Sequence, residues 1–187
     1  HSAAYEGTAH SAVTKHDEIS IAMDVAPGNL SPEAVSDSGG AMWKWEVYEH
    51  LFDINGLGGD LIPATAESYE LIDDVTYRIH LFEGVLDSDG NELHASDVIY
   101  AYDTLVAAGN RMSGDIAMYD HGEVVDDYTV KLVLVKPNVD WLDTLALPLA
   151  SIVNQKAIEA DPLKGPWVGT GMWIITDLEE GDYVHMV

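Results

Sequence analysis

The chain has 187 residues, and its 33 Asp and Glu against 8 Lys and Arg give a formal net charge of −25 at pH 7. Hydrophobic residues make up 47% of the chain, which excludes an acidic disordered segment, because disorder requires low hydrophobicity together with high charge. The deficit of basic residues argues against nucleic acid and anionic membrane surfaces as partners, since both are bound through clustered Lys and Arg.

Two absences narrow the classes of function further. The sequence has no cysteine, which excludes disulfides, thiol nucleophiles and Cys-based zinc sites. No apolar run approaches the roughly 18–20 residues that span a bilayer, so we expect no membrane insertion of this chain.

Residues 1–17 show neither helical nor strand periodicity and are rich in Ser, Ala and His. They lack the basic and apolar regions of an intact signal peptide. We predict a flexible segment without a catalytic role, which is either a remnant of cloning or the linker that follows a removed signal or lipid anchor.

A strand and a helix are the first elements that the pattern predicts. Residues 18–24 alternate apolar and polar side chains, which is the period of a strand. Between residues 40 and 52, Trp43, Val47 and Leu51 recur at i, i+4 and i+8, which predicts one buried stripe of a helix.

A hairpin and a helix follow. Strand-like runs over 61–71 and 75–82 meet at Asp73-Asp74, and the second run alternates as a strand with one buried face does. After the Asp89-Gly90 turn, a helix is predicted to open at His94 or Ser96 and to close at Gly109. Its apolar face consists of Val98, Ala101, Tyr102 and Leu105.

The remaining elements alternate hairpins, helices and a loop. Residues 123–125 and 128–135 predict a second hairpin, and Pro148 separates two predicted helices over 140–147 and 152–160. A Gly/Pro-rich loop over 165–171 precedes a last hairpin formed by residues 172–176 and 183–187. The sequence stops in the middle of this strand pattern, which is unusual for a natural end.

Six short segments, taken in their order along the chain, indicate a protein family. They read VYEHL at 47–51, LIPATAESYE at 61–70, TYRIHLFEGV at 76–85, DGNELHASDV at 89–98, DYTV at 127–130 and GTG at 169–171. Each resembles a motif of the family 5 extracellular solute-binding proteins, the dipeptide- and oligopeptide-binding receptors of ABC importers. Short motifs are weak alone, but six in the correct order over residues 19–187 are specific.

Some positions depart from the family pattern. The family has an Arg where this chain has Phe82, an aromatic-His pair at Asp87-Ser88, a capping Thr at His94 and Pro-Tyr at Met172-Trp173. Because these positions are mostly structural in the family, they put the subfamily in doubt rather than the fold.

The resemblance implies a mixed α/β (α+β) fold like that of the type II periplasmic binding proteins. Family members are several times longer, so we expect a truncated first lobe without the second lobe. The implied division is a flexible segment at 1–17, the opening strand and loop of the first lobe at 18–41, an inserted small α/β domain at 42–166, and the return into the first lobe at 167–187.

The resemblance also implies where a ligand binds. In the family a peptide lies between two lobes and is held largely through its backbone. Carried over residue by residue, the candidate ligand-binding residues are Val25, Ala26, Pro27, Met42, Trp43 and Tyr119. The first three offer open backbone groups to an extended ligand, whereas plain core packing is the alternative for the two aromatic residues.

No catalytic residue and no metal ligand is expected. Asp87, Asp89, Asn91 and Glu92 lack the spacing of an EF-hand loop and predict a solvated turn. The histidines never show HxxxH or HxH spacing. An acidic hydrolase would need two carboxylates with displaced pKa values in one pocket, and nothing in the sequence places such a pair.

The implied function is therefore that of an extracytoplasmic receptor fragment, without cofactor, which serves the permease of an ABC importer and makes or breaks no bond. It would lie in the periplasm or at the cell surface, with a lipid anchor in the full-length precursor. Two alternatives stay open. One is a nickel- or haem-type solute binder of the same family, and the other is a protein-interaction module, which an exposed apolar patch around Trp141 or Trp167 would favour.

The excess of carboxylates has two interpretations. An acidic cleft attracts cationic or zwitterionic peptides over a distance that salt screens. Alternatively, the charge reflects a salty or acidic habitat. Composition does not separate the two.

Overall fold

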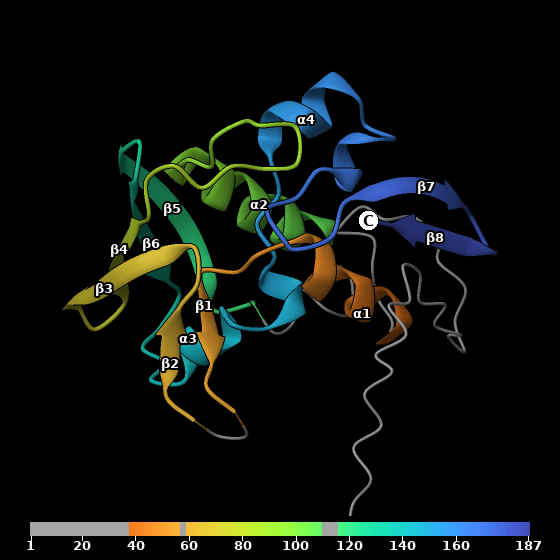
Figure 1. Ribbon diagram of the computed structural model, residues 1–187. Helices are drawn as coiled ribbons and strands as arrows, with labels where there is room; N and C mark the ends of the chain where they lie inside the picture. Colours follow the sequence, from red (N-terminus) through yellow and green to blue (C-terminus); the bar gives the residue numbers. More distant parts are fainter. Residues whose placement is uncertain (1–37, 57–58, 110–115) are drawn as a thin grey trace, which may run out of the picture.

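The computed structural model describes residues 38–56, 59–109 and 116–187. In this part of the chain, α2 packs on one face of a four-stranded antiparallel sheet, and two smaller hairpins lie beside it (Figure 1). The described residues include no helix that combines the length and the apolar character needed to cross a bilayer. The predicted opening strand at 18–24 lies outside these residues.

The central sheet has the strand order β3-β4-β6-β5. Its strands are β3 (Ala66–Asp73), β4 (Thr76–Leu81), β5 (Tyr119–Asp126) and β6 (Thr129–Leu134). Opposite residues such as Ile79 and Val130 share one face and are fully buried. On the other face, which is open to solvent, Arg78 pairs with Glu70 and Lys131 with Glu123. The alternation predicted for the second run is therefore confirmed.

The helix after the Asp89-Gly90 turn is α2 (Ala95–Ala108), also as predicted. His94 precedes it in an extended conformation, and its backbone N–H donates to the Asp97 carboxylate at 2.9 Å. Gly109 closes the helix at a φ of 59°, the left-handed region in which glycine avoids a Cβ clash. The buried face includes Val98 and Tyr102, as the spacing predicts, and packs on the sheet beside β5 and β6.

The predicted stripe of Trp43, Val47 and Leu51 is buried in full. The helix, α1 (Ser38–Val47), ends one turn early, so Leu51 belongs to the link into the next strand. Trp45, on the other side of α1, is 57% exposed. Trp141 is fully buried and its ring lies 5.5 Å from that of Tyr77. An exposed patch at Trp141 would have favoured the interaction-module alternative, but this side chain lies in the core.

The predicted strand over 61–71 is two strands. The short strand β2 (Leu61–Pro63) pairs with β1 (Phe52–Ile54), and β3 begins only at Ala66. Between them, Thr65 turns its backbone N–H and its hydroxyl to the carbonyl oxygen of His50, at 3.0 and 2.7 Å. These two hydrogen bonds interrupt the extended run.

Both helices predicted after residue 139 are shorter in the structure. They are α3 (Trp141–Thr144) and α4 (Gln155–Ala160), with a 3₁₀ turn over Pro148–Ala150 between them. Asn154 caps α4 by accepting from the N–H of Ala157 at 2.9 Å, and a cap marks the start of a helix. The helix therefore begins three residues later than the apolar pattern predicted, because Ile152 and Val153 are buried in an extended link.

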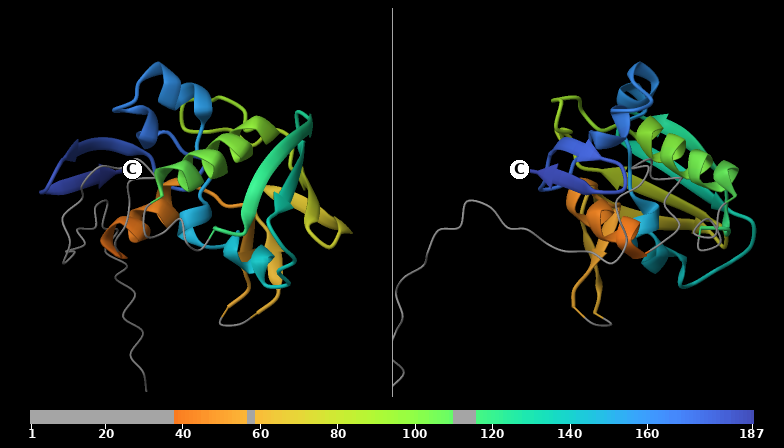
Figure 2. Two further views of the ribbon diagram at one scale, coloured as in Figure 1. Left: turned by 180° about the vertical axis from the view of Figure 1, so that it is seen from behind. Right: turned by 90° about the vertical axis from the view of Figure 1, so that its right-hand side faces the viewer.

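The last hairpin consists of β7 (Ile175–Glu179) and β8 (Tyr183–Met186). It projects on the side of α1, away from the central sheet (Figures 1 and 2). The predicted Gly/Pro-rich loop contains a 3₁₀ turn over Gly165–Trp167 and leads into this hairpin. The hairpin itself is confirmed.

Candidate functional site

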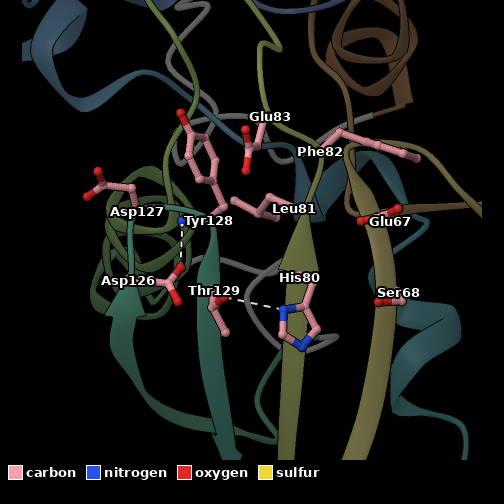
Figure 3. Close-up of a pocket in the computed structure, with 10 residues that line it drawn as sticks. All are labelled: Glu67, Ser68, His80, Leu81, Phe82, Glu83, Asp126, Asp127, Tyr128 and Thr129. Atoms are coloured by element: carbon pink, nitrogen blue, oxygen red, sulfur yellow. Dashed lines mark hydrogen bonds between the residues drawn. The ribbon is translucent and has the colours of Figure 1, made fainter.

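A cavity of about 690 Å³ opens at one end of the central sheet (Figure 3). Three segments line it, namely the start of β3, the end of β4 with the residues after it, and the turn between β5 and β6. The lining residues are Glu67, Ser68, His80, Leu81, Phe82, Glu83, Asp126, Asp127, Tyr128 and Thr129. Segments that are distant in the sequence thus meet because β4 and β6 are neighbours in the sheet.

One row of the sheet contributes three of these side chains. Ser68 lies opposite His80, and His80 lies opposite Thr129. The Nδ1 atom of His80 and the hydroxyl oxygen of Thr129 are 3.2 Å apart, within hydrogen-bond distance (Figure 3). The strand register therefore fixes the orientation of the only imidazole among the lining residues.

The turn between β5 and β6 is held by its own side chains. Asp126 accepts from the backbone N–H of Tyr128 at 3.0 Å. Hydrogen bonds from the Thr129 side chain and from the backbone lower the pKa of Asp126, so its carboxylate stays ionised. The Tyr128 hydroxyl donates to Glu92 at 2.8 Å, and this bond is the main reason that the pKa of Tyr128 is raised to about 12. The turn is thus fixed by hydrogen bonds and carries the ionised Asp126 carboxylate.

The charge of the cavity has one sign. Glu67, Glu83, Asp126 and Asp127 line it, together with no Lys or Arg. Such a wall attracts cationic groups. A carboxylate that is held ionised, as Asp126 is, does not serve as a general acid. Over the described residues, no group of His, Asp and Glu is arranged to hold a metal ion.

The glycine-rich loop at 169–171 packs on the end of α1. Gly171 donates its N–H to the carbonyl oxygen of Val47 at 2.8 Å, and the N–H of Glu49 donates to the Thr170 hydroxyl at 3.2 Å. A Cβ on Gly169 would lie 2.0 Å from the same Val47 oxygen, so the approach requires glycine there. The loop at 169–171 therefore contacts the end of α1, so the two ends of the chain segment that runs from α1 to this loop lie side by side.

The turn around Asp87 is structural. The Asp87 side chain is buried, and its carboxylate accepts from the N–H groups of Asp89 and Asn91 and from the Asn154 amide, at 2.9, 2.8 and 2.7 Å. The prediction of a solvated turn is wrong for Asp87, because Asn154 of the distant α4 region covers it. These hydrogen bonds occupy the oxygens that a cation would need.

The predicted ligand-binding residues do not line this cavity where the structure describes them. Val25, Ala26 and Pro27 lie outside the described residues, and so does the side chain of Met42 in α1. Trp43 is 3% exposed and its ring lies 5.8 Å from that of Tyr48. Packing also accounts for the sixth residue.

That sixth residue, Tyr119, is 3% exposed. Its hydroxyl donates to Asp103 at 2.7 Å, and its ring contacts Tyr102 at 5.7 Å. The cavity was not predicted from the sequence, although the sequence shows the polar alternation of 76–80 and the paired acids at 126–127. The missing information was that these two segments are adjacent.

Residues 60–187 match the model of the bacterial extracellular solute-binding proteins, family 5 middle. The chain belongs to this family. The mixed helix-and-sheet fold is that of the type II periplasmic binding proteins, as predicted. Family 5 consists of solute-binding proteins.

Two curated relatives show what the family contains. The chain is 31% identical to the dipeptide-binding protein of Escherichia coli K12 over 134 residues, which cover 61% of this chain and 25% of that protein. It is 30% identical to the glutathione-binding protein GsiB of Pectobacterium atrosepticum over 165 residues, which cover 84% of this chain and 32% of that protein. The chain thus spans only 25% to 32% of the length of these relatives.

A solved structure extends the comparison to the fold. Haemophilus influenzae OppA in complex with RPPGFSPFR superposes with a TM-score of 0.76 at 20% identity. The superposition covers 87% of this chain and 36% of that protein. The fold of this chain therefore matches one part of that longer protein.

Proposed function

We propose that this chain is part of an extracytoplasmic receptor that binds peptides or similar small solutes between two lobes and passes them to the permease of an ABC importer. The match of residues 60–187 to family 5 carries this proposal. The names of the relatives support the solute class, since one is a dipeptide-binding and one a glutathione-binding protein. The receptor would lie in the periplasm or at the cell surface, where a lipid anchor would hold the full-length protein.

The proposed division has a small domain at 42–166 between the first-lobe segments 18–41 and 167–187. The contact of the 169–171 loop with the end of α1 supports it. In the proposed division the chain enters the small domain near α1 and returns from it near this loop, so two neighbouring backbone segments would make the connection, as in an inserted domain. The hydrogen bond from Ser88 N–H to the Gly169 carbonyl oxygen, at 2.9 Å, attaches the small domain to the returning loop.

The proposed mechanism is closure of two lobes around the solute. Closure is favoured only if the solute binds the closed form more tightly than the open form. The hydrogen-bonded junction at 169–171 would keep the small domain attached to its lobe while the lobes move. No bond is made or broken, and no cofactor is required.

Calorimetric titration of a mixed pool of di- to pentapeptides tests the proposal. It compares this chain with a full-length parent. We expect the parent to bind and the chain alone to bind at least about tenfold more weakly, since it lacks the contacts and the closure that the second lobe provides. If the parent binds no peptide, the peptide assignment fails, and glutathione, nickel and haem are the next solutes to titrate.

A further inference from the structure

The strand β3 is an edge of the central sheet. Among the described strands it pairs within this sheet only with β4. Seven of its eight residues are exposed, all except Ala66. Its pairing with β4 is regular from Ser68 to Leu71 and irregular on both sides of that stretch. An edge of this kind presents backbone N–H and C=O groups that another extended chain can pair with.

The exposed edge carries large apolar side chains. Tyr69, Leu71 and Ile72 are 47%, 55% and 43% exposed. The ring of Tyr69 is held in place by Phe52 and Tyr77, with centroids 5.5 and 6.5 Å away. Proteins usually blunt exposed edges with charge or cover them. On β3 three acidic residues share the edge with these three apolar side chains, so the edge favours a partner that offsets the acidic charge.

The charge of β3 selects among partners. The strand carries Glu67, Glu70 and Asp73 and no basic residue. A second copy of this chain would place these acids opposite acids, between two molecules that each carry a net charge of −25, and like charges directly opposite destabilise a strand pair. A segment with basic residues meets no such penalty. The acidic cavity, which Glu67 and Ser68 also line, lies at the start of the same strand.

The other edge of the sheet does not offer the same surface. The strand β5 packs against α2, and on it the Nδ1 atom of His121 lies 2.7 Å from the Asp120 carboxylate. Only Val124 and Val125 are large apolar side chains exposed on it. The two edges therefore differ in apolar surface, with three large exposed apolar side chains on β3 and two on β5.

We propose that the outer edge of β3 docks an extended segment of a partner protein in which Lys or Arg alternates with apolar residues. The segment would add a strand beside Ser68–Leu71, with its backbone paired to β3, its apolar side chains against Tyr69 and Leu71, and a basic side chain near the acidic cavity. The irregular pairing on both sides of 68–71 limits the contact to a short segment. This interaction goes beyond solute binding and does not depend on it.

Fluorescence anisotropy with a labelled peptide of alternating Lys and Val tests the proposal. The variant Leu71→Lys places on the edge of β3 a positive charge that repels the Lys residues of the peptide. Val124→Lys is its matched control at the edge of β5, where Val124 is 51% exposed. We expect L71K to weaken binding at least about tenfold and V124K to leave it within about twofold, since only the first blunts the docking edge. A Glu/Val peptide and a Lys/Val peptide with a central proline, which removes a backbone donor, should both fail to bind.

Hydrogen exchange in the unaltered chain gives a second readout that needs no variant. The bound Lys/Val peptide should slow exchange of the backbone amides between Ser68 and Leu71 and leave those of β5 unchanged. The proposal is overturned if L71K and V124K bind equally well, if the acidic peptide binds as tightly, or if no amide of β3 is protected. Dimerisation of the chain that L71K abolishes would overturn it as well, since the occupant would then be a second copy.

Discussion

The buried imidazole of His50 makes stability depend on pH. His50 is 8% exposed, and its Nε2 atom lies 3.4 Å from the hydroxyl oxygen of Ser151. Burial lowers the pKa of His50 from 6.5 to about 4, with the Lys44 ammonium acting in the same direction and Asp53 against it. The side chain is therefore neutral in the folded chain under conditions where it is protonated in the unfolded chain.

The direction in which stability changes with pH follows from proton binding at His50. Between pH 6.5 and about 4 the unfolded chain binds a proton at His50 that the folded chain does not, so the free energy of unfolding falls as the pH falls through this window. Over this window the free energy of unfolding changes by about 3 kcal/mol, because one pKa unit corresponds to about 1.4 kcal/mol. Stability above pH 6.5 is unaffected by this group.

The variant His50→Gln tests the magnitude. Glutamine keeps a polar group near Ser151 but does not titrate. When the pH falls from 7 to 4, the free energy of unfolding measured in urea should therefore drop by up to about 3 kcal/mol less in H50Q than in the unaltered chain. His185→Gln is the control, since His185 lies on the exposed side of β8. Glu49, whose pKa is raised by burial and by Asp53, changes stability in the opposite direction with pH, and its contribution cancels when two unfolding curves are subtracted.

Equal pH dependence in H50Q, H185Q and the unaltered chain would refute this reasoning. It would mean that the folded chain protonates His50 as readily as the unfolded chain does.

Three further substitutions test the packing. Asp87→Ala should lower the free energy of unfolding by about 3 kcal/mol, because it leaves four hydrogen-bond donors without their acceptor, whereas Ala at the exposed Asp89 should change it by less than about 0.5 kcal/mol in the same urea titration. Gly169→Ala should cost at least about 2 kcal/mol, since the new Cβ meets the Val47 backbone oxygen; a melting temperature equal to that of the unaltered chain would contradict the close contact. Tyr102→Phe should stabilise by about 1 kcal/mol, because the buried Tyr102 hydroxyl has no hydrogen-bond partner among the described residues; thermal unfolding at a lower temperature would show that the hydroxyl is bound.

The acidity of the chain has a local consequence at the cavity. Its four carboxylates act on a cationic group over a distance that salt shortens, to roughly 8 Å at physiological ionic strength. Calorimetric titrations of peptides at low and high salt therefore separate the long-range attraction of a cationic peptide from its direct contacts.

Local patterns determined the elements that have one buried face. Alternation along 75–82 and the spacing of Val98, Ala101, Tyr102 and Leu105 were sufficient for β4 and α2, because the period of the backbone alone decides which side chains share a face. The ordered motifs over 19–187 were sufficient for the family. The glycine at 169 was recognisable as part of a motif, but only its 2.0 Å approach to Val47 explains why glycine is required.

The tertiary structure decided whatever depends on distant partners. Trp45 and Trp141 look alike in the sequence, yet one is 57% exposed and the other fully buried, since burial depends on which element packs above each side chain. Asp87 was expected in solvent and is covered by Asn154, a residue 67 positions away. The cavity and the exposed edge of β3 follow from the strand order β3-β4-β6-β5. No local period encodes that order, because it is set by contacts between segments that are far apart along the chain.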